Sequence, residues 1–164
     1  MAKKPAETPN FESVLDTPSQ EVSRPRPLPQ GTYLCMVKGL PRIDKSTQKG
    51  TEFSEYTLQM MEAADDVDEE ELKQSLTKGN GDLIPLRDRS VRVTFYHTED
   101  ALWRLKKFLN DLQIDEADDE DEPRTIRQRM QDVPGRQVYA HIKHSPSPDG
   151  ETVYANVDKT AKVS

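Results

Sequence analysis

The stretch SVRVTFYHTEDALWRLKKFLNDLQI, residues 90–114, decides the fold. Its first part predicts a strand over residues 89–96, because apolar side chains alternate there with polar ones. Its second part predicts an amphipathic helix, because apolar side chains recur every three or four residues from 101 to 112. Thr98 is expected to cap this helix, with two acidic residues in the first turn.

The composition limits how much of the 164-residue chain can fold. Hydrophobic residues make up 33% and charged residues 32%, whereas roughly 45–50% of a typical globular chain is apolar. We therefore expect one domain over residues 28–162 behind a disordered, proline-rich leader over residues 1–27. The single cysteine suits a reducing cytoplasm. No apolar run reaches the roughly 20 residues of a membrane helix, so no membrane partner is expected.

The net charge of −7 is distributed unevenly. Residues 62–88 carry a net charge of −6 and residues 115–122 carry −7, which leaves +6 for the rest of the chain. Two acidic insertions, at 62–88 and 115–123, thus interrupt a mildly basic framework. They are expected to be solvated segments; alternatively, they imitate nucleic acid and compete for a basic surface.

Four further segments alternate as half-buried strands do: residues 32–40, 52–61, 136–144 and 152–158. Gly39 is expected to form a bulge in the first of them. Residues 42–50 are expected to form a polar loop after that strand. Short helices are expected at 67–76 and 125–130. The predicted fold is mainly β: a five-stranded OB-fold Greek-key barrel with one helix between the third and fourth strands. An α+β sandwich, with the helix on one face of an open sheet, is the alternative.

The outward sides of these strands combine aromatic and basic residues. Bases can stack on aromatic rings while Lys and Arg neutralise phosphates, so this combination indicates a single-stranded nucleic-acid binder. Tyrosine, lysine and arginine are also common on any strand surface, which is the alternative. The candidate binding residues are Lys38, Arg42, Lys45, Lys49, Arg92, Tyr96, Tyr139, His141, Lys143 and Tyr154.

Four segments carry a resemblance to a known family: LPQGTYLCMVKG (28–39), Lys49-Gly50, ALWRLKKFLNDL (101–112) and VPGRQVYAHIKH (133–144). Over about residues 28–160 the chain resembles small phage-encoded proteins that lie among replication and recombination genes. These are thought to be OB-fold single-stranded DNA-binding proteins. The resemblance implies DNA binding in the host cytoplasm alongside replication or recombination proteins. The chain departs from the pattern in its long acidic insertion and in its ending, DKTAKVS.

No sequence motif assembles a nucleophile, a base and an orienting group, so an enzyme is not expected. One cysteine and three histidines make a zinc site improbable, and no cofactor is expected. Cys35 is expected in the core, and Trp103 over the end of the barrel, with stacking on DNA as the alternative. The other functions considered are an acidic phage accessory protein that binds a host or phage protein, and a virion assembly protein. The sequence does not distinguish a monomer from a homo-oligomer.

Overall fold

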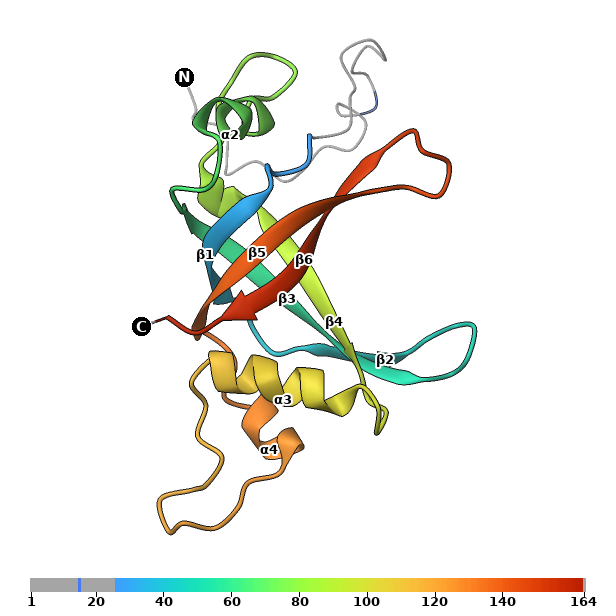
Figure 1. Cartoon of the computed structure of the whole chain (residues 1–164), viewed down its shortest axis with the longest axis vertical. Helices are drawn as coiled ribbons and strands as arrows, with labels where there is room; N and C mark the ends of the chain where they lie inside the picture. The colour runs from blue at the N-terminus through green and yellow to red at the C-terminus, as the bar shows by residue number, and fades with distance from the viewer. Residues whose placement is uncertain (1–14, 16–25, 164) are drawn as a thin grey trace, which may run out of the picture.

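The computed structural model describes residue 15 and residues 26–163, and its fold is mainly β (Figure 1). Six antiparallel strands form one sheet, where five were predicted. They are β1 (Gly31–Val37), β2 (Arg42–Lys45), β3 (Glu52–Ala63), β4 (Ser90–Tyr96), β5 (Gln137–Pro146) and β6 (Val153–Ala161). The helices are α2 (Glu69–Ser75), the 3-10 helix η2 (Leu86–Asp88), α3 (Leu102–Asp111) and α4 (Ile126–Met130). Most of the predicted leader lies outside the described residues.

Strand β3 is the centre of the sheet. It pairs with β4 along one edge, and with β1 and then β2 along the other, so that Val37 lies opposite Leu58 and Arg42 opposite Glu55. Strand β1 also pairs with β5, and β5 with β6. Strands β4 and β6 are in contact, yet no ladder joins them within the described residues. The sheet is therefore open, and the predicted closed barrel is not confirmed.

The core confirms the predicted inward sides of β1, β3 and β5. Tyr33, Cys35 and Val37 from β1 are buried, as are the alternate residues Tyr56, Leu58 and Met60 of β3 and Val138, Ala140 and Ile142 of β5. Burial raises the pKa of the Cys35 thiol to about 12, as expected for a core residue. Each large apolar side chain buried in this way contributes roughly 1.5–3 kcal/mol.

Helix α3 covers one end of the sheet with its predicted apolar stripe (Figure 1). Leu105, Phe108 and Leu109 are buried, and the Phe108 ring packs 5.1 Å from Tyr56 and 5.0 Å from Phe95 between ring centroids. Such tilted aromatic pairs add roughly 0.5–1.5 kcal/mol beyond the area that they bury. A second helix, α4, also lies between β4 and β5, and it confirms the short helix predicted at 125–130.

The predicted cap of α3 is wrong. The helix begins at Leu102 with Ala101 in the cap position, and no side chain caps it. Thr98 instead accepts the N–H of Ala101 through its hydroxyl, at 3.2 Å, in a turn that precedes the helix. The two acidic residues expected in the first helical turn therefore lie before it. Local hydrogen bonding of a threonine side chain competes here with helix initiation.

The predicted polar loop at 42–50 is wrong in its first half, because residues 42–45 form β2. A backbone bond from Ser46 N to Thr51 O, at 2.8 Å, closes the turn of the β2–β3 hairpin. Gly39 is not a bulge: it has a φ of +79° after the end of β1, and the register of β1 on β3 shifts between Leu34 and Cys35. A glycine adopts that φ without the steric cost that other residues incur.

The first acidic insertion contains the predicted short helix, seen as α2. Asp68 caps it by accepting the N–H of Glu71 at 3.0 Å, and three glutamates fill its first turn, where negative charge is favoured. Within the described residues, no helix is long and apolar enough to span a membrane.

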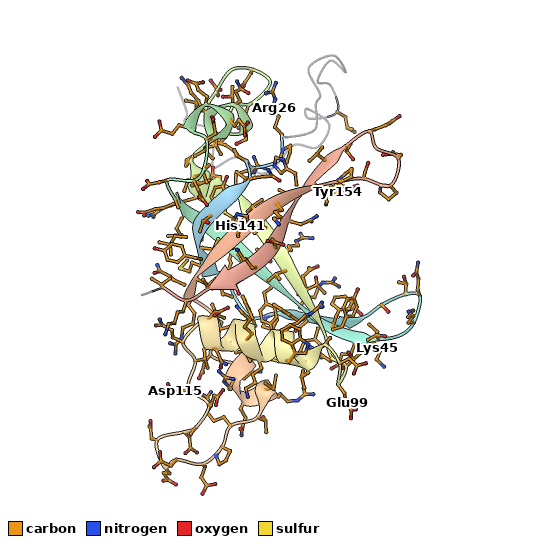
Figure 2. All side chains as sticks on the ribbon, viewed as in Figure 1. Arg26, Lys45, Glu99, Asp115, His141 and Tyr154 are labelled. Carbon is orange, nitrogen blue, oxygen red and sulfur yellow. The ribbon has the colours of Figure 1, made fainter. Side chains whose placement is uncertain are left out.

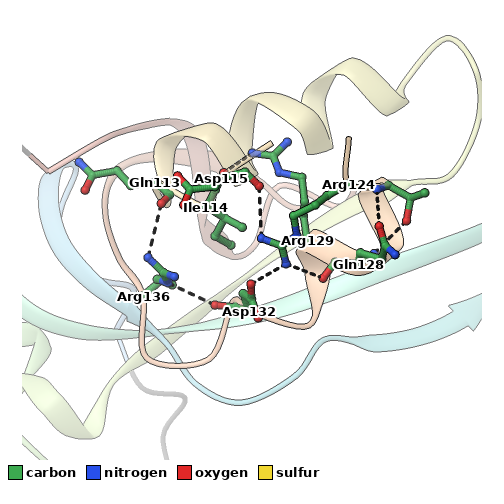
Figure 3. Close-up of polar contacts among 9 residues, drawn as sticks. Gln113, Ile114, Asp115, Arg124, Gln128, Arg129, Asp132 and Arg136 are labelled. Carbon is green, nitrogen blue, oxygen red and sulfur yellow. Dashed lines mark hydrogen bonds and ion pairs between the residues drawn. The ribbon is translucent and has the colours of Figure 1, made fainter. Parts of the chain in front are cut away.

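The second acidic insertion is a loop between α3 and α4 whose two ends are held together by arginines (Figure 3). The buried Arg129 donates to the carbonyl of Ile114, at 2.6 Å, and to Asn110, at 2.7 Å. Arg124 Nη1 donates to the carbonyl of Asp115 at 3.3 Å. From these contacts the loop extends away from the sheet, on the side opposite the β2–β3 hairpin (Figure 1).

Candidate nucleic-acid interface

A groove of about 790 Å³ lies between the β2–β3 hairpin and the end of β4. We call it the hairpin groove. Four of the predicted binding residues line it together, because the hairpin brings the polar segment 42–49 beside the last residue of β4. Its lining includes Arg42, Lys45, Lys49, Phe53 and Tyr96.

Two aromatic rings stand side by side in the hairpin groove. Phe53 and Tyr96 are opposite each other on β3 and β4, with ring centroids 5.9 Å apart at 64°. The Arg42 guanidinium lies 5.2 Å from the Phe53 ring centroid. Tyr96 is 46% exposed, so its ring is accessible to a partner. A planar base could stack on this surface.

The cations of this groove differ in how free they are. Arg42 contacts Asp44 at 2.7 Å and Glu55 at 3.4 Å, so its charge is shared. Neither Lys45 nor Lys49 forms an ion pair with any residue that the structure describes. These two lysines are therefore the groove residues best able to attract a phosphate.

Two more predicted cations continue along the same outward side of the sheet. Arg92 lies opposite Thr57 in the β3–β4 ladder, and the N–H of Lys38 donates to the carbonyl of Thr57 at 2.8 Å. Both side chains are exposed. Because outward residues of a strand recur every two positions, Arg92 and Tyr96 share this side. Basic residues thus follow β4 away from the hairpin groove.

The other predicted residues lie elsewhere, on β5 and β6 (Figure 2). Asp158 lies 3.7 Å from His141 Nδ1 and 3.5 Å from Lys143 Nζ, which offsets positive charge there. Tyr139 is half-buried opposite Leu34, and Tyr154 lies on β6 near the β5–β6 hairpin. None of these four residues lines the hairpin groove.

Two aromatic residues differ from the sequence-based expectation. Phe53 was missed, although the alternation of residues 52–61 assigns it to the outward side with Glu55. Trp103 was expected to pack over the end of a barrel, but its residue is 59% exposed. That prediction is wrong because Leu105 and Phe108 already fill the position facing the core.

A partly buried polar trio lies where the start of β3 meets the residue that follows β4. His97 Nδ1 is 2.7 Å from Glu52 Oε1, and its Nε2 is 2.9 Å from Ser54 Oγ. The hydrogen bond from His97 lowers the pKa of the Glu52 carboxyl. The connectivity matches an acid, a base and a nucleophile, yet Ser54 is 0% exposed, so its hydroxyl is not accessible to a substrate. We interpret the trio as a link between β3 and the end of β4.

No group of three or more potential metal ligands occurs among the described residues. No protein-family model matches this chain, and no curated protein is significantly similar to it. The resemblance to phage single-stranded DNA-binding proteins therefore stays a prediction.

Proposed function

We propose that this chain is a non-enzymatic single-stranded DNA-binding protein with an OB-fold arrangement of strands, acting in phage DNA replication or recombination in the host cytoplasm. The arrangement is supported by the strand order. If β1 and β2 count as one bent strand, the sheet runs β4-β3-β1-β5-β6, with the helices α3 and α4 between β4 and β5. An OB-fold is a partly open five-stranded barrel whose second and third strands and flanking loops bind oligonucleotides.

The hairpin groove carries the proposal, because it combines all the groups that non-specific strand binding requires. Phe53 and Tyr96 provide a stacking surface, at roughly 1–3 kcal/mol per base. Lys45 and Lys49, which form no ion pair with a described residue, provide positive charge beside it. The groove also lies at the second and third strands of the proposed OB-fold, β3 and β4, beside the loop that joins the first strand to the second.

The β5–β6 hairpin corresponds to the other flanking loop of an OB-fold. Both hairpins project from the same side of the molecule (Figure 1). Tyr154 lies opposite Ser145 in the β5–β6 ladder, close to this second hairpin (Figure 2). In the proposed complex, a single strand crosses β4 between the hairpins, with Arg92 and Lys38 beside its backbone.

Binding of fluorescein-labelled oligo(dT), followed by anisotropy, tests the proposal. We expect micromolar or tighter binding at low salt, and a steep loss of affinity between about 50 and 200 mM salt, because displaced counterions drive binding. Duplex DNA of the same length should compete poorly, because its bases are not free to stack. No change in anisotropy or electrophoretic mobility at low salt would overturn the proposal.

A further inference from the structure

A second groove, of about 470 Å³, lies where the sheet is open between β4 and β6. We call it the seam groove. Helix α3 forms one wall of it with Trp103 and Arg104, and the last residues of β6 form another, Lys159 among them. Nothing in the expected OB-fold site includes this helix.

Trp103 is the most prominent feature of the seam groove. Its residue is 59% exposed, and the Arg104 guanidinium lies 5.4 Å from its ring centroid. The indole has the largest stacking face of any side chain, and an arginine beside it can contact a phosphate while a base stacks on the ring. The same pairing of ring and guanidinium occurs between Phe53 and Arg42 in the hairpin groove.

The charge of the seam groove also suits a nucleic-acid backbone. Arg104 and Lys159 form no ion pair with any described residue, whereas Lys107 is engaged by Asp111 at 2.7 Å and by the carbonyl of Thr160 at 2.9 Å. The one acidic residue lining the groove, Asp158, lies 3.5 Å from Lys143, outside the groove. The groups free to bind are therefore positive.

The two grooves meet on β4. Tyr96 lines the hairpin groove and Thr94 lines the seam groove, and both side chains point outward from the same strand. Outward residues two apart on a strand are about 7 Å from each other. A single strand leaving Tyr96 could therefore enter the seam groove without crossing another element.

We infer that the seam groove is a second nucleotide subsite, in which Trp103 stacks on a base and Arg104 and Lys159 contact the adjoining phosphates. This inference rests on the proposed function. It also gives the open edge between β4 and β6 a role, because closing the sheet there would remove the groove.

The chain offers a direct readout, because Trp103 is its single tryptophan. Two signals are followed in one titration: the anisotropy of labelled oligo(dT), which reports all binding, and the protein fluorescence excited at a wavelength that tyrosine does not absorb, which reports Trp103 alone. We expect a long oligonucleotide to quench the tryptophan at saturation. Trp103→Leu should weaken its binding about 5- to 150-fold, as loss of one stacked base does. Trp103→Phe should keep most of the affinity.

The matched control is Leu83→Ala, which truncates a similarly exposed apolar residue, 58% exposed, in the first acidic insertion; its affinity should equal that of the wild type. A rise in anisotropy without any change in tryptophan fluorescence, together with wild-type affinity of Trp103→Leu, would overturn the inference but leave the proposed function intact. No rise in anisotropy with any oligonucleotide would overturn the proposed function itself.

Discussion

The outward side of β2, β3 and β4 and the outward side of β5 and β6 both carry aromatic and basic residues, but the surroundings of these residues differ. On the first, Lys45 and Lys49 are unpaired among the described residues and lie in a groove with two aromatic rings. On the second, Asp158 lies within 4 Å of both His141 and Lys143.

This difference shows what period-two alternation leaves out. Alternation assigns each side chain to the inner or outer side of its own strand. It does not identify the residue across the ladder, and that neighbour decides whether a cation is free. Lys143 on β5 is opposite Asn156 on β6, and Asp158 lies two residues further along β6. The carboxylate near Lys143 therefore comes from the neighbouring strand, and the sequence of β5 alone does not reveal it. The two sides are therefore expected to differ in function as they do in surroundings.

The largest expected effect comes from reversing charge in the hairpin groove. The double variant Lys45→Glu, Lys49→Glu should reduce oligo(dT) affinity by at least about 100-fold at low salt, because two phosphate contacts become repulsive. Neutralising both lysines to alanine should lower the slope of log affinity against log salt by about 1.4, at roughly 0.7 per contact on single strands.

The comparison variant on the other side is Lys143→Ala, for which we expect wild-type affinity and an unchanged salt slope. Anisotropy titrations over a series of salt concentrations provide both quantities. Equal losses for Lys143→Ala and the lysine pair would remove the distinction between the two sides.

A smaller effect is expected from removing one ring. Phe53→Ala should weaken binding about 5- to 150-fold, because it deletes a stacking face and the edge contact that positions Tyr96. Tyr139→Ala on β5 should change affinity less than about two-fold. Melting temperatures of both variants serve as the folding control. If Tyr139→Ala has the larger effect on affinity, the binding side has been misassigned.

Removing Asp158 should reduce the contrast between the two sides. Asp158→Asn leaves His141 and Lys143 without a carboxylate neighbour, and we expect a rise in affinity of at most about five-fold, the scale of a surface ion pair. Because Asp158 also lines the seam groove, the variant is repeated with Lys143→Ala. Loss of the gain in that background assigns it to Lys143; persistence of the gain assigns it to His141 or to the seam groove.

The smallest expected effect is on acid stability. The hydrogen bond from His97 lowers the pKa of Glu52 below its ordinary value of 4.5. The hydrogen bond between His97 and ionised Glu52 thus stabilises the fold fully above about pH 4.5, and this stabilisation is lost as the pH falls through the lowered pKa of Glu52. Thermal melts from about pH 3 to 7 should show a shallower acid decline for Glu52→Gln than for the wild type. Identical acid profiles would show that the trio does not link β3 to β4.

Much of the fold could be predicted from sequence, because burial imposes a strict pattern. Tyr56, Leu58 and Met60 alternate without interruption, and so do the inward residues of β1 and β5. The errors arose where one local preference competes with another. Thr98 forms a turn rather than a helix cap, and residues 42–45 pair as β2 because a tight turn brings them onto β3.

The candidate site was harder to predict than the core. Arg42, Lys45, Lys49 and Tyr96 were identified because charge and aromatic character can be recognised without a fold. Phe53 was missed because the prediction relied on tyrosine and basic side chains, whereas phenylalanine has no polar atom that indicates an exposed ring. Trp103 was misplaced because helical spacing alone does not show how much core area the neighbouring leucines already cover.

The contacts of Arg124 and Arg129 at the base of the second acidic loop determine how easily the net charge of the protein can change. Arg129 joins α4 to the carbonyl of Ile114, and Arg124 joins the far end of the loop to the carbonyl of Asp115, so backbone contacts fix the two ends of the loop independently of the side chains between them. Closing a loop of different length between fixed ends costs little, about 0.6 kcal/mol per doubling. Residues 115–122 carry a charge of −7, equal to that of the whole chain. The loop can thus be exchanged as a unit: replacing it would change the net charge of the protein while the sheet and both grooves stay unchanged.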